Sequence, residues 1–140
     1  MVQLIVGNKG KGKTKFLLDK VNEEVKNVLG NVVFLDKNTS HMFELNNRVR
    51  LIVAPDYMID SSEAFIGFVS GIISQDHDLQ QIYIDSFLQV ACIGEGASIE
   101  NSLERLQKLS DKFNVDFVIS VSMNVSDLPE IVNSMTVTSL

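Results

Sequence analysis

The stretch that decides the fold runs from Val2 to Thr14 and reads Val-Gln-Leu-Ile-Val-Gly-Asn-Lys-Gly-Lys-Gly-Lys-Thr. Its first part, Val2 to Val6, is an apolar run with the length of a buried strand. Glycines and lysines interrupt the run, and a pattern of helical period then continues until Gly30. The apolar positions of that pattern are Phe16, Leu17, Val21, Val25 and Val28. The sequence therefore predicts a strand, a glycine-rich turn and a helix in direct succession.

The turn itself carries a specific spacing, G-x-x-x-x-G-K-T, from Gly7 to Thr14. Backbone N–H groups can wrap a phosphate only where a β-carbon does not obstruct the approach, which explains the glycines. The helix that follows directs its unpaired N–H groups and its positive dipole end at the same phosphate. We expect Lys13 to contact the β and γ phosphates of a nucleoside triphosphate and Thr14 to bind Mg²⁺. The candidate binding residues are Gly7, Asn8, Lys9, Gly10, Lys11, Gly12, Lys13, Thr14 and Lys15.

A carboxylate further along the chain is the expected partner of Thr14. Asp85 follows the apolar run at residues 82–84, so it would lie at the C-terminal edge of a buried strand, where open α/β sheets bind their ligands. A carboxylate at that edge can hold Mg²⁺ through water. The alternative interpretation is that Asp85 only forms the turn at the strand end.

The remaining pattern predicts an α/β fold. Apolar runs of strand length alternate with segments of helical period, which is typical of a mostly parallel, five-stranded sheet with helices on both faces, in three layers. Expected strands cover residues 2–6, 31–35, 51–54, 82–84 and 117–121, with a further edge strand at 137–140. Expected helices follow the first strand, cover residues 64–73 after a cap at Asp60 and Glu63, begin at Ser98, and include a short one at 127–132.

Composition sets the limits on organisation and partners. A chain of 140 residues with 45% hydrophobic residues is expected to form one domain, residues 1–140. Its net charge of -6 does not indicate nucleic acid as a partner. No apolar stretch is long enough for a membrane span, and nothing indicates secretion, so we expect a cytoplasmic protein. Cys92 is the only cysteine, which excludes an internal disulfide, and we expect it to be buried.

In these motifs the chain resembles the P-loop NTPases, and within them the RecA-like and replicative-helicase-like ATPase cores. It also looks like short bacterial proteins named after twitching-motility ATPases. The resemblance covers roughly residues 1–129 and rests on the loop at Gly7–Thr14, the segment 82–89 ending its strand at Asp85, the helix at 103–113 and the strand at 116–122. It implies ATP and Mg²⁺ as ligands, and a homo-oligomer or a protein partner.

Two positions depart from that family pattern. The glutamate that activates the attacking water corresponds to Asn38, and the polar sensor residue corresponds to Met123. The resemblance therefore implies weak hydrolysis with a regulatory or assembly role, unless Asp36, Glu95 or Asn124 compensates. Open alternatives are a small-molecule kinase similar to thymidine kinase, an oligomeric ATPase completed by a neighbour's arginine, and a scaffold that retains the loop for folding only. Arg48, Arg50 and Arg105 are the arginine candidates.

Overall fold

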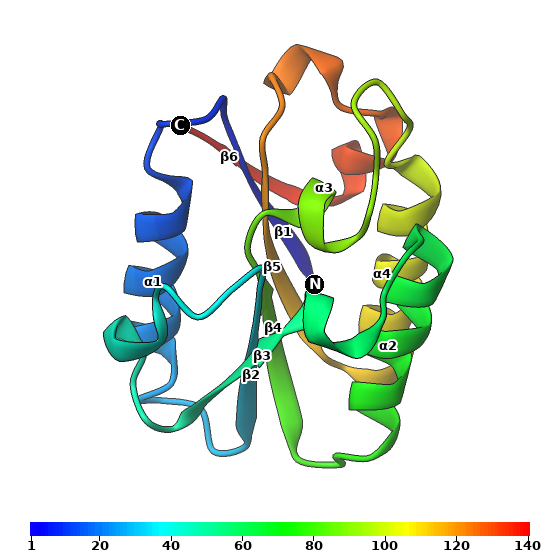
Figure 1. The fold of residues 1–140 in the computed structure, drawn as a ribbon. Helices are drawn as coiled ribbons and strands as arrows, with labels where there is room; N and C mark the ends of the chain where they lie inside the picture. The colour runs from blue at the N-terminus through cyan, green and yellow to red at the C-terminus, as the bar shows by residue number, and fades with distance from the viewer.

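The computed structural model describes residues 1–140, in which strands and helices alternate along the chain (Figure 1). The strands are β1 (Val2–Val6), β2 (Asn31–Asp36), β3 (Val49–Val53), β4 (Leu79–Ile84), β5 (Asp116–Val121) and β6 (Thr136–Ser139). The α-helices are α1 (Lys13–Glu24), α2 (Ser62–Ser74), α3 (Phe87–Val90) and α4 (Glu100–Phe113). Short 3₁₀ turns occupy Met42–Glu44, Ala54–Tyr57, Val125–Asp127 and Glu130–Ser134.

All six strands form one sheet in the order β3-β2-β4-β5-β1-β6, and every neighbouring pair is parallel. This confirms the predicted α/β fold. The sixth strand is the edge strand expected near the C-terminus, and it pairs with β1. Because all strands run the same way, the residues that follow them meet at one edge of the sheet.

Helices cover both faces of the sheet, which gives the three predicted layers. Figure 1 shows α1 on one face, with α2 and α4 on the other. The larger apolar cluster, 25 buried residues, lies between the sheet and α2 and α4, whereas the cluster beside α1 has 10. Alternate residues of β1 to β5 contribute to different clusters, as the period of a strand requires. Phe34 and Tyr83 on the α1 side are stacked at 6.3 Å.

Several local expectations need correction. The cap of α2 is Ser61, whose hydroxyl accepts from Ala64 N, and it is not the Asp60–Glu63 pair. Helix α4 begins at Glu100 and not at Ser98. The short helix expected at 127–132 consists of two 3₁₀ turns.

Cys92 was expected to be buried and is exposed. It follows α3 in a left-handed conformation with φ 55°, and its Sγ lies 3.4 Å from the carbonyl oxygen of Ile59. None of the helices combines the length and the apolar character needed to cross a membrane.

Candidate functional site

The glycine-rich loop has the backbone conformation that a phosphate cradle needs. Gly10 and Gly12 have φ angles of 82° and 84°, a left-handed region that disfavours side chains. A β-carbon built at either glycine meets no atom within 4 Å, so the space beside the loop is free. Helix α1 begins directly after Gly12, and no side chain caps it. Its first N–H groups are therefore available to an anion.

Lys13, the first residue of α1, is held inside this loop. Its side chain is buried at 8% exposure, and Nζ donates to the carbonyl oxygen of Asn8 at 2.9 Å. Burial lowers the pKa of Lys13 from its ordinary 10.5, and the charge of Asp85 opposes that shift. A buried ammonium with a single carbonyl partner is costly, and an anion in the loop would offset that cost.

A hydrogen-bonded cluster joins α1 to the ends of β4 and β5. Thr14 Oγ1 donates to Asp85 Oδ2 at 2.9 Å, and Ser120 Oγ donates to Asp85 Oδ1 at 2.6 Å. Ser120 Oγ also accepts from Ser86 N at 2.9 Å. Both oxygens of Asp85 are thus oriented, and the carboxylate is 2% exposed. The structure brings the predicted pair, Thr14 and Asp85, into direct contact.

Asp36 is a second buried carboxylate at this edge. Because side chains alternate between the two faces of a strand, Asp36 lies on the same face as Phe34, toward α1. In the same way, Asp85 lies on the face of Tyr83, and Ser120 lies on the face of Val118. Asp85 N donates to Leu35 O, so the ends of β2 and β4 lie together. Asp36 is 0% exposed; its Oδ1 accepts from Lys37 N at 2.7 Å, and its Oδ2 has no partner. Burial raises its pKa, and the nearby charge of Asp85 adds to the rise.

These oxygen groups suit Mg²⁺. The cation prefers hard oxygen ligands and usually takes only one or two carboxylates, with water and substrate phosphates completing its shell. Thr14 and Asp85 offer one hydroxyl and one carboxylate in the pocket, whereas the unpaired oxygen of Asp36 is buried outside its lining. No group of three or more His, Cys, Asp or Glu residues is placed to hold a metal ion. A metal held jointly with phosphates fits this set better than a metal bound by the protein alone.

A pocket of about 810 Å³ opens over the loop and the strand ends. Its lining includes five of the nine predicted binding residues, and it adds Lys37 and Glu95 from later loops. Gly7, Asn8, Lys11 and Lys15 do not line it; Lys15 instead pairs with Asp19 at 3.0 Å. The lining residues are Lys9, Gly10, Gly12, Lys13, Thr14, Lys37, Asp85, Ser86, Leu88, Gln89, Ile93, Glu95, Ser120 and Ser122.

The two positions that depart from the family pattern lie outside this lining. Asn38 is exposed, and its Oδ1 accepts from Ser40 N and Ser40 Oγ within its own turn. Met123 packs against the larger apolar cluster. Its neighbour Asn124 accepts from Asn8 Nδ2 at 3.0 Å, which makes Asn124 the polar group from the end of β5 that contacts the loop.

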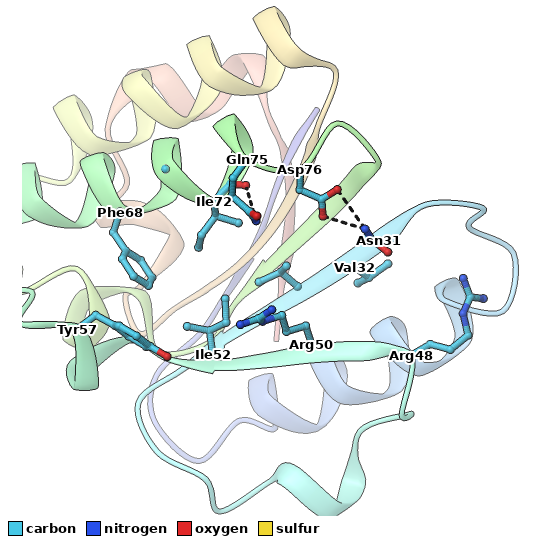
Figure 2. Close-up of a pocket in the computed structure, with 12 residues that line it drawn as sticks. Asn31, Val32, Arg48, Arg50, Ile52, Tyr57, Phe68, Ile72, Gln75 and Asp76 are labelled. Carbon is cyan, nitrogen blue, oxygen red and sulfur yellow. Dashed lines mark hydrogen bonds between the residues drawn. The ribbon is translucent and has the colours of Figure 1, made fainter.

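The arginine candidates also lie away from the pocket. Arg48 donates to Val25 O and Val28 O and thereby caps the C-terminal end of α1. Arg105 is exposed on α4. Arg50 lines a separate pocket of about 770 Å³ between α2 and the strands β2 and β3, with Tyr57 and Phe68 at one end (Figure 2). No residue is shared by the two pockets, so no arginine of this chain contacts the loop's pocket.

Sequence reasoning overlooked the importance of Asp36 and missed Lys37 altogether. The predicted second strand ends at Leu35, one residue short of β2, and the family resemblance points to Asn38 in place of Asp36. The available signal was the two-residue period of a strand, which places Asp36 on the same face as Val32 and Phe34 when the apolar run is extended by one residue.

Comparisons with known proteins bear on the fold. No protein-family model and no curated protein sequence matches the chain. The structure is similar to the flagellar accessory protein FlaH from Methanocaldococcus jannaschii, with a TM-score of 0.57, 13% identity and 96% of this chain covered. This chain spans 65% of the length of that structure. At such identity the likeness establishes the fold alone, an all-parallel six-stranded α/β sheet that is consistent with the RecA-like P-loop fold.

Proposed function

We propose that this chain binds a nucleoside triphosphate, with ATP as its natural nucleotide, together with Mg²⁺. The observation that carries the proposal is Lys13, a largely buried lysine whose partly buried ammonium lies inside a glycine loop with free space beside it. An ammonium, unpaired helix N–H groups and left-handed glycines converge on the same space, and a polyphosphate satisfies all three. The adjacent Thr14–Asp85 pair supplies oxygen atoms for the metal.

In this arrangement the chain's own residues would orient the phosphates and the metal. The loop from Gly7 to Thr14 would surround the inner phosphates, and Lys13 would exchange its bond to Asn8 O for phosphate oxygens. Mg²⁺, when bound, neutralises charge that develops on the phosphates. Thr14 and Asp85 would position the metal, and Ser120 would keep the Asp85 carboxylate in place.

We further propose that hydrolysis, where it occurs, depends on Asp36 and not on Asn38. A general base must be able to take a proton, and Asp36 is the carboxylate next to Asp85 at this edge of the sheet. Its unpaired Oδ2 is buried and does not line the pocket, so this role requires the side chain to turn toward the pocket. Asn38 has an amide that cannot act in this way, and its oxygen is engaged by Ser40.

A role in assembly is the context that we propose for this binding. The similar structure is described as a flagellar accessory protein, which suggests that a nucleotide could control contacts with a protein partner. Because no arginine lines the pocket, fast turnover would require a group supplied by another chain.

The test is isothermal titration of MgATP, MgGTP and MgADP into the wild-type protein and Lys13→Ala, followed by phosphate release on the same samples. Lys26→Ala is a suitable control, because Lys26 pairs with Glu23 near the far end of α1. We expect binding of MgATP that Lys13→Ala abolishes and Lys26→Ala preserves. Equal binding by the wild-type protein and Lys13→Ala would contradict the proposal.

A further inference from the structure

Lys37 is a cation that the fold itself does not explain. It follows Asp36 directly after β2, is half-buried, and lines the pocket above the loop. None of the molecule's ion pairs includes Lys37, and its ammonium makes no hydrogen bond. The charge of Lys37 attracts the buried carboxylate of Asp36 and opposes the rise of its pKa, but it is the smallest influence on that group and involves no direct ion pair. Such an attraction adds little to folding stability.

The backbone places Lys37 opposite the loop. Strand order puts β4 and β5 between β1, which leads into the loop, and β2, which leads into Lys37. Asp85, at the end of β4, therefore lies between Lys37 and the loop along the sheet edge. Lys37 N donates to Asp36 Oδ1 at the start of the bend that follows β2. Lys13 and Lys37 thus approach the same pocket from opposite sides.

We propose that Lys37 contacts the terminal phosphate of a bound nucleoside triphosphate and thereby makes the site prefer a triphosphate to a diphosphate. The inference rests on the proposed function. If the loop holds the inner phosphates and the Thr14–Asp85 pair holds the metal, the third phosphate is the group that extends beyond Asp85 toward β2. A diphosphate ends before that point, so Lys37 makes no contact with it.

The charges around the pocket fit this assignment. Its cations are Lys9, Lys13 and Lys37, and its acidic residues are Asp85 and Glu95, with Asp36 buried next to Lys37. Asp85 is committed to Thr14 and Ser120. Glu95 is exposed and takes part in no ion pair. An additional anion between Lys13 and Lys37 would therefore give both ammonium groups an oppositely charged group in direct contact.

The experiment compares two ligands in four proteins by isothermal titration. The ligands are the Mg²⁺ complexes of ADP and of a non-hydrolysable ATP analogue, and the proteins are wild type, Lys37→Met, Lys37→Arg and Lys26→Met. Loss of one charged hydrogen bond should weaken the ATP analogue about tenfold in Lys37→Met, with less than a twofold change for ADP. Lys37→Arg should retain most of the preference, and Lys26→Met should match wild type.

A thermal unfolding measurement without nucleotide separates binding from folding. Lys37→Met should unfold close to the wild-type temperature, because the ammonium makes no hydrogen bond or ion pair and only its weak attraction to Asp36 is lost. An equal loss of affinity for both ligands, or no loss for either, would overturn the role of Lys37 while wild-type binding still supports the proposed function. If wild type binds neither ligand, the proposed function and this inference both fail.

Discussion

Thr14 and Asp85, which lie 71 positions apart in the chain, are joined by a hydrogen bond of 2.9 Å from Thr14 Oγ1 to Asp85 Oδ2. The bond connects the first turn of α1 to the end of β4. It therefore brings the two oxygen groups best suited to Mg²⁺ together before any ligand arrives. The second oxygen of Asp85 depends on Ser120, and this makes Ser120 a sensitive position.

Ser120→Ala should destabilise the protein and weaken its affinity for Mg²⁺. The change leaves Asp85 Oδ1 and Ser86 N without their partner in a buried environment, which costs about 1–3 kcal/mol. Urea unfolding measures the stability. Ser122→Ala is the matched control, because Ser122 makes no side-chain hydrogen bond and should change stability by less than about 0.5 kcal/mol. Equal stability of both variants would show that the Ser120 bond contributes nothing.

Lys13→Met should make the nucleotide-free protein more stable at neutral pH. Burial lowers the pKa of Lys13 in the folded state, so the unfolded chain binds the proton more tightly. Stability of the wild-type protein should consequently rise as pH increases from the lowered pKa toward 10.5, and this rise should be absent in Lys13→Met. Urea titrations from pH 7 to 10.5 measure the difference. The same variant should lose any stabilisation by MgATP. A nucleotide-free Lys13→Met protein that is less stable than wild type at neutral pH would contradict the prediction.

Asp36→Asn should reduce the rate of phosphate release at least tenfold, because Asp36 is the carboxylate buried beside Asp85. Asn38→Ala should leave the rate near the wild-type value. Single-turnover phosphate release with MgATP measures both variants. The reverse ranking would assign the role to Asn38 and remove Asp36 from the reaction.

Asp36→Asn also has a pH signature. Burial raises the pKa of Asp36 above its ordinary 3.8, so the folded state binds the proton more tightly than the unfolded state. This group therefore lowers stability progressively as pH rises from 3.8 through the raised pKa. We expect the stability gain of Asp36→Asn over wild type to grow across that window in urea titrations. A gain that is independent of pH would contradict the assigned cause.

Asn124→Ala should loosen the loop without abolishing nucleotide binding. Asn124 Oδ1 accepts from Asn8 Nδ2 on the surface, and such a bond contributes about 0.5–1.5 kcal/mol. The affinity for MgATP should fall less than about tenfold, and hydrogen exchange should accelerate at residues 8–12. Met123→Leu is the control, because it conserves the apolar packing of Met123. Unchanged exchange in Asn124→Ala would show that the loop is held by its own backbone.

The sequence by itself determined the glycine loop with its lysine and threonine, because these features depend on local backbone conformation and on the dipole of the helix that follows. The strand-end position of Asp85 followed from a short apolar run in the same way. The α/β class was equally accessible, since alternating strand and helix periods leave few architectures.

Only the tertiary structure decided which strand ends are neighbours. The order β3-β2-β4-β5-β1-β6 pairs segments far apart in the chain, and no local pattern encodes that choice. This strand order places Asp36 beside Asp85 at one edge of the sheet. It also places Lys37 in the lining of the pocket above the loop, which nothing in the local sequence distinguishes from the other lysines. The burial of a site residue and the charges that act on it depend on neighbours that are distant in the sequence. The sequence alone gives only the order of residues along the chain, so these properties had to come from the tertiary structure.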